Sequence, residues 1–270
     1  MLLSIRHETR YEYEEPVSYS IHALKLTPRA DPGQRVVNWR LHSPGERLEQ
    51  VDPFGNFMHV VTMEEPHRMM EVVVDGIVEV DAQAAQLPPG PGGLSPLAYL
   101  APTPLTRPDP VLRELAERHL GQHPAEPRSL MALVTGIRAA VACQSSMTEA
   151  THGAVEAVDL GAGTCQDQAH VLIACCRAAG IPARYVSGYF LGDGPAESTS
   201  HAWVDVWLGP EQGWLGLDVT HAVQAGARHC RLAVGRDYLD AAPVRGVRRG
   251  GGQESMSVTV RVSGSEGQQQ

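Results

Sequence analysis

The first 82 residues alternate polar and apolar side chains in short runs that turn-forming residues separate. These runs are Thr9–Tyr13, Ile21–Leu26, Val36–Leu41, Met58–Met63 and Val72–Val80. A period of two residues is typical of antiparallel strands with one buried face. The turn sequence Asp52–Asn56 lies between two of the runs. Residues 1–82 therefore predict an antiparallel β domain.

A change in composition follows this β pattern. Residues 83–109 are rich in Pro and Gly, which predicts a linker and an ordered arm. Apolar residues then recur at helical spacing after Pro110, and a second helix is predicted over Leu130–Val141. We expect a mixed helix and sheet domain over residues 110–263 that ends in a strand at Met256–Val262. The polar residues 264–270 predict a disordered tail.

The segment 158–221 carries the candidate chemistry, and it opens with a helix that starts at Cys165. Thr164 is a suitable N-cap, and Asp167 stands three residues further on, as in a capping box. Free N–H groups and the helix dipole favour an anion at such a position. A thiolate is the reactive form of cysteine, so Cys165 is a candidate nucleophile. Most free cysteines are only buried packing residues, so Cys165 alone does not decide the matter.

The predicted helix continues to about Ala179 with one apolar stripe. The stripe consists of Ala169, Leu172, Ile173 and Cys176, at positions i, i+3, i+4 and i+7. Cys165 lies four residues before this stripe. We therefore expect its sulfur to face whatever the helix packs against.

A predicted hairpin supplies a base and a carboxylate. His201 opens the strand that runs to Leu208, and Asp218 lies near the end of the strand that starts at Trp214. The two side chains share a sheet face only if opposed residue numbers sum to an odd value, as with 208 opposite 213. We predict this odd register, because a triad needs Asp218 to orient His201.

The remaining residues near this segment have structural interpretations. Trp203 is predicted to pack around the hairpin and to exclude water from the site. His170 and His221 are predicted to be structural or to lie at the rim of the site.

Several motifs resemble the bacterial transglutaminase-like proteins, which are often described as candidate cysteine proteases. These motifs are Gly163–Asp167, Gly180–Tyr189, Ser200–Trp203, Gly213–Asp218 and Gly235–Gly246. The first 80 residues are similar to the β-rich N-terminal domain of those proteins, so the resemblance covers nearly the whole chain. It implies an α+β fold in which a papain-like core follows the β domain. The nucleophile would begin a helix that packs on an antiparallel sheet.

The resemblance also implies residue roles: Cys165 as nucleophile, His201 as general base and Asp218 as the group that orients His201. The sequence departs from the family in two places. Residues 142–145 replace a stretch that is usually aromatic, and Gln168 replaces a residue that is often aromatic. We therefore consider the Gln144 side chain a candidate oxyanion donor, beside the Cys165 backbone N–H, and Trp203 a candidate cleft residue.

The implied reaction begins with attack of the Cys165 thiolate on an amide carbonyl of a peptide or protein, which gives a thioester. Resolution by water makes the protein a peptidase or amidase, whereas resolution by an amine makes it a transglutaminase. We expect hydrolysis, with acyl transfer as the alternative. A non-catalytic peptide-binding module on the same fold is the other alternative. No cofactor and no metal ion are expected.

Composition narrows the partners. A net charge of −9 argues against a nucleic-acid partner. An uninterrupted apolar run of ~18 residues is not found, so we expect no membrane span and a cytoplasmic protein. The five cysteines show neither a disulfide framework nor zinc-ligand spacing. The sequence leaves the oligomeric state open.

Overall fold

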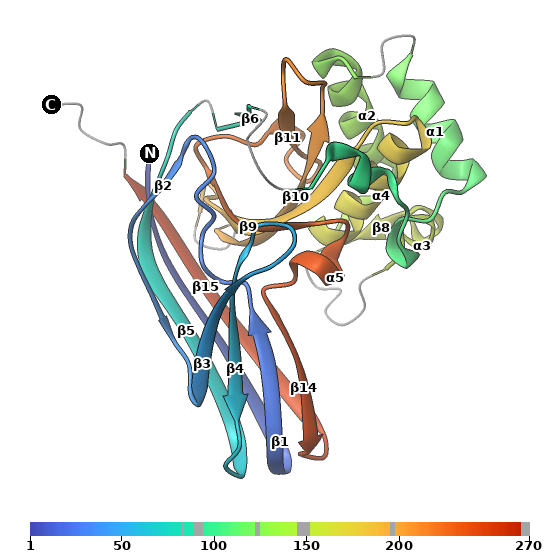
Figure 1. Cartoon of the computed structure of the whole chain (residues 1–270). Coiled ribbons are helices and arrows are strands. Elements are labelled where there is room, and N and C mark those ends of the chain that lie inside the picture. The colour runs from blue at the N-terminus through green and yellow to red at the C-terminus, as the bar shows by residue number, and fades with distance from the viewer. Residues whose placement is uncertain (83, 89–93, 122–124, 145–151, 195–197, 266–270) are drawn as a thin grey trace, which may run out of the picture.

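A computed structural model of the chain describes residues 1–82, 84–88, 94–121, 125–144, 152–194 and 198–265 (Figure 1). The elements up to the first long helix are β1 (Leu2–Leu24), β2 (Gln34–His42), β3 (Glu46–Val51), β4 (Phe57–Met63), β5 (His67–Val80), β6 (Gln86–Leu87), and the 3-10 helices η1 (Pro96–Leu100) and η2 (Pro104–Thr106). The elements that follow are α1 (Pro110–Leu120), α2 (Pro127–Ala140), β7 (Ala142–Cys143), α3 (Ala154–Leu160), β8 (Ala162–Gly163), α4 (Cys165–Ala178), β9 (Ala183–Phe190), β10 (Thr199–Trp207), β11 (Trp214–Asp218), β12 (Val223–Gln224), β13 (His229–Gly235), α5 (Tyr238–Ala241), β14 (Val244–Gly250) and β15 (Glu254–Ser265).

The N-terminal region forms a seven-stranded antiparallel sheet, as the alternating pattern predicted. Its order is β2-β5-β1-β4-β3, and β14 and β15 pair along β1 as well. The two runs predicted as separate strands before residue 27 belong to the single long strand β1, which was not expected. A register shift between Glu12 and Val17, next to Pro16, lets this strand bend, since proline cannot donate to a ladder. Residues 2–12 and Val17 of β1 pair with β5, and residues 20–24 pair with β4.

The second region is a helical layer on a second antiparallel sheet of order β12-β11-β10-β9-β13, with β6 added beside β11. Helix α4 lies at its centre and contacts β9 and β10 (Figure 1). The sequence predicted that α4 buries a single apolar stripe, but the buried surface of the helix is wider than this stripe. All residues from Asp167 to Cys176 are buried, because α1, α2 and α3 pack against the other sides of the helix.

The C-terminal strand belongs to a different sheet from the one predicted. Residues 256–262 were assigned to the second domain, but β15 pairs with β1 from Leu2↔Ser265 to Tyr13↔Glu254. The apolar alternation identified a strand but could not identify its partner. Gly264 and Ser265, predicted as part of a disordered tail, are the last residues of β15. The rest of that predicted tail lies outside the described residues.

The predicted arm within residues 83–109 packs on the second domain. Leu87 and Tyr99 are buried in one apolar cluster with Trp214, which lies on β11. The rings of Tyr99 and Trp214 meet edge to face, with centroids 5.4 Å apart. The arm therefore covers an end of the second sheet.

The two sheets are joined at the edge strand β13. Two side-chain amides of the N-terminal region form hydrogen bonds with the backbone of β13, as a neighbouring strand would. Gln34 accepts from the Arg231 N–H (2.7 Å) and donates to the Arg231 carbonyl (2.9 Å). Asn56 accepts from the Val234 N–H (2.8 Å) and donates to the Val234 carbonyl (2.7 Å). These amides occupy hydrogen-bonding groups that an open sheet edge would leave unpaired.

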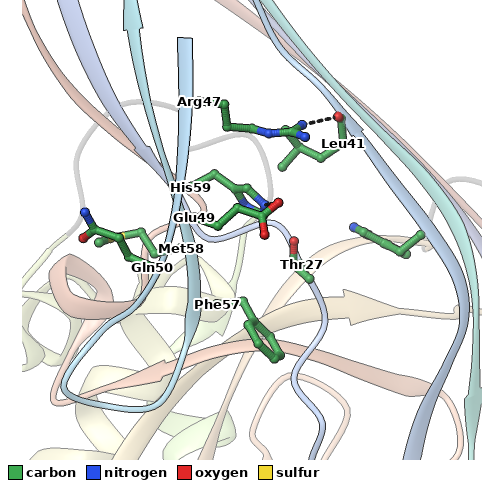
Figure 2. A pocket seen from close by; sticks show the side chains of 9 residues that line it. Thr27, Leu41, Arg47, Glu49, Gln50, Phe57, Met58 and His59 are labelled. Atoms are coloured by element: carbon green, nitrogen blue, oxygen red, sulfur yellow. Dashed lines mark hydrogen bonds and ion pairs between the residues drawn. The ribbon is translucent and has the colours of Figure 1, made fainter.

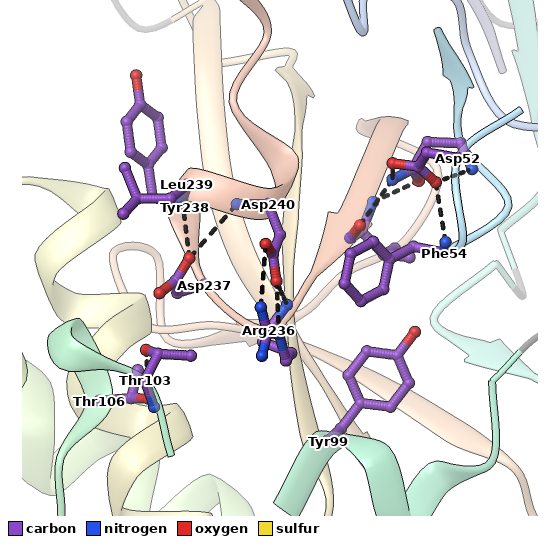
Figure 3. A network of polar contacts seen from close by, with 12 residues as sticks. Asp52, Phe54, Tyr99, Thr103, Thr106, Arg236, Asp237, Tyr238, Leu239 and Asp240 are labelled. Atoms are coloured by element: carbon purple, nitrogen blue, oxygen red, sulfur yellow. Dashed lines mark hydrogen bonds and ion pairs between the residues drawn. The ribbon is translucent and has the colours of Figure 1, made fainter. Parts of the chain in front are cut away.

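The turn that presents Asn56 is held by Asp52 (Figure 3). Asp52 Oδ1 accepts from the backbone N–H groups of Phe54 and Asn56, both at 2.9 Å. Lys25 contacts Asp52 Oδ2 at 2.8 Å and also donates to the backbone carbonyl of Asp240 in α5. Lys25 therefore connects the turn to the short helix that follows β13.

Replacing Asn56 with Leu should destabilise the protein, because the Val234 N–H and carbonyl would lose their partners. We expect a loss of about 1–3 kcal/mol for each backbone group left unpaired. Urea unfolding followed by circular dichroism measures this, with Gln50→Leu on the exposed strand β3 as the matched control. Equal unfolding midpoints for the two variants would contradict the role of Asn56.

Candidate active site

Cys165 is the first residue of α4, as the sequence predicted. Thr164 Oγ1 accepts from the Asp167 N–H (3.4 Å), and the Asp167 carboxylate accepts from the Thr164 N–H (2.8 Å). Asp167 also accepts from the His152 N–H at 2.9 Å. This capping box fixes the start of the helix. The half-buried Cys165 thus lies where the first-turn N–H groups have no intrahelical partner.

The hairpin has the predicted odd register. Val204 pairs with Leu217, and Trp207 pairs with Trp214. His201 and Asp218 consequently point to the same face, and His201 Nε2 lies 2.9 Å from Asp218 Oδ2. The geometric part of the triad prediction is therefore confirmed for these two side chains.

Asp218 Oδ2 receives three imidazole nitrogens. Besides His201 Nε2, His221 Nδ1 lies at 2.7 Å and His229 Nε2 at 3.0 Å. Burial alone would raise the pKa of the carboxyl, but the hydrogen bonds from the three rings hold it well below its usual range. Asp218 is therefore an ionised acceptor, although it is fully buried.

His229 takes part in this cluster as a neutral ring. Its Nδ1 accepts from the Gly226 N–H (3.2 Å), so the ring proton is on Nε2 and faces Asp218. Burial lowers the pKa of His229 in spite of the carboxylate. Sequence analysis missed His229, because no motif or strand pattern relates it to Asp218. It placed His221 at the rim or in a structural role, and the short spacing from Asp218 was the available signal for their contact.

His201 is the charged member of the cluster. Burial alone would lower its pKa, but hydrogen bonds with Asp218 and Cys165 raise it to about 10. Since Nε2 faces Asp218, Nδ1 remains for the Cys165 side. Cys165 and this protonated imidazole line one pocket, which is the arrangement that a cysteine nucleophile requires.

Aromatic rings and a glycine hold His201 in place. The Trp203 ring lies along that of His201, with centroids 6.3 Å apart and planes at 28°. Phe190 stacks on His221 with a centroid distance of 4.0 Å. Gly188 faces His201 across the sheet, and a Cβ there would lie 2.4 Å from the Trp203 ring. Trp203 is fully buried behind His201, so the prediction of a cleft position is wrong and the prediction of a packing position is confirmed.

The departures from the family pattern lie beside Cys165. β7 and β8 pair in parallel, with Cys143 opposite Gly163, and the Gln144 N–H donates to the Gly163 carbonyl at 2.8 Å. Gln144 therefore lies beside the start of α4, and its role as oxyanion donor stays a prediction. Gln168 is buried, donates to the Val141 carbonyl (2.8 Å) and accepts from the Thr220 hydroxyl (2.7 Å). Its amide thus ties α4 to the segment after Asp218.

A pocket of about 240 Å³ contains both Cys165 and His201. Its other lining residues come from β1, α4, β9, β10, α5, β14 and β15 and include Pro243 before β14, so both regions of the chain contribute to it. A separate pocket of about 330 Å³ lies on β2, β3 and β4 (Figure 2). Within it Arg47 donates to the Leu41 carbonyl, and His59 faces Glu49 at 3.4 Å. This second pocket shares no residue with the Cys165 pocket.

One group of described side chains has the composition of a metal site. Ligand atoms of His201, Asp218 and His221 lie within 4.8 Å of one another. The same nitrogen atoms are hydrogen-bonded to Asp218, so a metal ion there would have to replace these bonds.

Comparison with known proteins agrees with this architecture. The family model described as "Bacterial transglutaminase-like N-terminal region" matches residues 3–79. The model described as "Transglutaminase-like superfamily" matches residues 113–219. An uncharacterized protein of Mycobacterium leprae is 30% identical, over 97% of this chain and 98% of its own. The chain belongs to the transglutaminase-like superfamily.

Other similar proteins match different shares of the chain. An uncharacterized protein of Mycobacterium tuberculosis is 32% identical over 90% of this chain and 86% of its own. A protein-glutamine gamma-glutamyltransferase of Pseudomonas aeruginosa is 39% identical, but over only 33% of this chain and 15% of its own. The structure of a candidate cysteine protease from Cytophaga hutchinsonii has a TM-score of 0.79 at 23% identity, over 100% of this chain and 92% of that chain. This similarity shows that the two proteins share a fold.

None of the described helices of this transglutaminase-like protein combines the length and the apolar character that crossing a membrane would require.

Replacing Cys165 with Ala should lower the pKa of His201, because one of the two partners that favour the imidazolium is removed. We expect a decrease of about 1–3 pH units. An NMR titration of the ring protons measures it, with Cys143→Ser as the control for loss of a neighbouring thiol. A His201 pKa that stays near 10 in Cys165→Ala would contradict the contact between the two side chains.

The same pKa makes stability depend on pH. The folded value of about 10 lies above the ordinary 6.5, so the folded protein keeps a proton that the unfolded chain loses within this interval. The stabilisation is complete below pH 6.5 and is lost as the pH rises towards 10. Over this interval wild type should lose more free energy of unfolding than His201→Gln, by at most about 1.4 kcal/mol per pH unit, and most steeply above about pH 8.5, where the unfolded chain has also lost the Cys165 proton. Urea unfolding at several pH values measures this, and parallel losses would contradict it.

Proposed function

We propose that this protein is a cysteine-dependent amide-bond enzyme that acts on peptides or proteins through a thioester. The observation that carries the proposal is the position of His201, which contacts ionised Asp218 on one side and Cys165 on the other. Membership in the transglutaminase-like superfamily supports the same assignment.

In the first half of the reaction, the Cys165 thiolate attacks the amide carbonyl carbon. The C–S bond forms, and the carbonyl electron pair moves to oxygen, where the N–H groups at the start of α4 can stabilise the charge. The C–N bond then breaks, and His201 Nδ1 gives its proton to the leaving amine. The products of this half are a free amine, a thioester on Cys165 and a neutral His201.

In the second half, neutral His201 takes a proton from the incoming nucleophile. The nucleophile attacks the thioester carbonyl, and the C–S bond breaks to restore the thiolate. Asp218 keeps its hydrogen bond to Nε2 throughout, so the same ring tautomer serves both halves.

We propose water as the main nucleophile, which makes the protein a peptidase or amidase. Water needs no binding site of its own, whereas an amine acceptor must be held beside the thioester. The second candidate is acyl transfer to an amine. Its support is the partial similarity to a protein whose name is protein-glutamine gamma-glutamyltransferase.

Cys165 should react with iodoacetamide at neutral pH about tenfold faster than a cysteine in the denatured chain, since an ordinary thiol is only a few per cent ionised there. Partial burial of its sulfur and the nearby Cys165 raise the pKa of Cys143, and this neighbouring thiol is replaced in the test so that it does not contribute to the signal. Labelling is measured by peptide mass spectrometry in a Cys143→Ser background. His201→Ala should abolish the excess rate. A Cys165 that labels no faster than the denatured control would favour a non-catalytic peptide-binding module.

Peptide substrates should give mainly hydrolysed products, and Cys165→Ala should give none. His201→Ala should reduce kcat by about 10²–10⁴-fold, as expected for the loss of a general acid and base. Product analysis by mass spectrometry, with and without a primary amine, separates the two candidates. Mainly amine-conjugated products would replace the hydrolase assignment with acyl transfer.

A further inference from the structure

The Cys165 pocket has one wall that the second domain does not supply. This wall is the inner face of the paired strands β1 and β15, where Thr9 is opposite Val258 and Tyr11 is opposite Met256. The start of β14 adds Val244 to it. The wall therefore comes from the two ends of the chain.

Exposure along the inner face of β15 increases towards the pocket. Val262 is 7% exposed and lies in the core between the two sheets, and Val260 is half-buried. Val258 and Met256 are 46% and 58% exposed. All four side chains share one face, since strand residues alternate. The apolar face that packs against β9 and β13 at one end of β15 is thus uncovered at the other end, next to Cys165.

The pocket is uncharged apart from the Cys165 and His201 pair. Its lining in the described part of the chain contains no Asp, Glu, Lys or Arg. His7 binds the hydroxyl groups of Tyr189 and Thr9, both at 2.8 Å, and burial lowers its pKa to about 4. Ser187 donates to the Ala241 carbonyl at 2.7 Å. A charged substrate group in this pocket would lose water without gaining a partner of opposite charge.

We propose that the β1–β15 wall selects the acyl donor, by binding an apolar side chain next to the reactive carbonyl against Val258, Met256 and Tyr11. This inference rests on the proposed function. The acyl group of the substrate stays attached to Cys165 in the thioester. A pocket that begins at this sulfur therefore contacts the acyl group and discriminates between substrates that differ in it. A volume of about 240 Å³ fits a short peptide segment, being smaller than the ~300–1,000 Å³ of sites for drug-sized ligands.

The test uses chloromethyl ketones of acetylated Leu, Phe, Asp and Lys, which alkylate an active-site cysteine. The full-length protein in the Cys143→Ser background should react with the Leu and Phe reagents roughly tenfold faster, or more, than with the charged ones. Val258→Asp should reduce the Leu and Phe rates by about the same factor. Met256→Ser is the second variant and should reduce these rates in the same direction. Both positions are exposed, so neither change removes a core side chain.

Val247→Asp is the matched control. Val247 is an apolar residue of β14 that is 66% exposed and does not line the pocket, so its replacement should leave all four rates unchanged. The rate with iodoacetamide, which carries no side chain, is measured for each variant and divides out any change in the reactivity of Cys165 itself.

Two results would overturn the inference and leave the enzyme assignment intact. One is equal alkylation rates for the four reagents, and the other is Leu and Phe rates that stay unchanged in both Val258→Asp and Met256→Ser. Slow alkylation by iodoacetamide in every variant would instead reject the enzyme assignment, and the donor pocket with it.

Discussion

The arrangement of the candidate active site depends on keeping one buried carboxylate ionised. An isolated charge of this kind would be costly inside the protein. Asp218 avoids the cost because three imidazole nitrogens surround its Oδ2 at 2.7–3.0 Å. The positive charge of His201 compensates its negative charge, and neutral His229 adds a hydrogen bond without adding charge. The carboxylate can then orient His201 and favour its protonated form in the pocket that also contains Cys165.

The N-terminal region does more than precede the core. Its amides Gln34 and Asn56 pair with the free edge of β13, the strand that carries His229. The packing of β1 and β15 on the second sheet brings an apolar strand face beside Cys165. The interface between the two regions therefore fixes the strand that carries His229, a hydrogen-bond partner of Asp218. The same interface forms one wall of the Cys165 pocket.

Local rules predicted those parts of the site that are set by neighbouring residues. The helix start at Cys165 follows from a capping pair three residues apart, and the contact of His201 with Asp218 follows from the parity of a hairpin register. The predicted strands and long helices were recovered for the same reason. Long-range pairing was not predictable in this way. The alternation at residues 256–262 identified a strand, but nothing in it pointed to β1, about 250 positions earlier. His229 was missed because a third imidazole on Asp218 depends on the pairing of β13 with β9.

The position of the pocket also limits what similarity can say about substrates. The match to the superfamily model ends at residue 219. It includes Cys165, His201 and Asp218 but no residue of β15, which forms part of the β1–β15 wall. The Pseudomonas aeruginosa relative is similar over a third of this chain. Similarity to the superfamily model therefore does not extend to the β15 residues that border Cys165. In the proposed reaction, Cys165, His201 and Asp218 account for thioester formation. In the same proposal the β1–β15 wall selects the acyl donor, and the choice between water and an amine depends on what can reach the thioester once that wall is occupied.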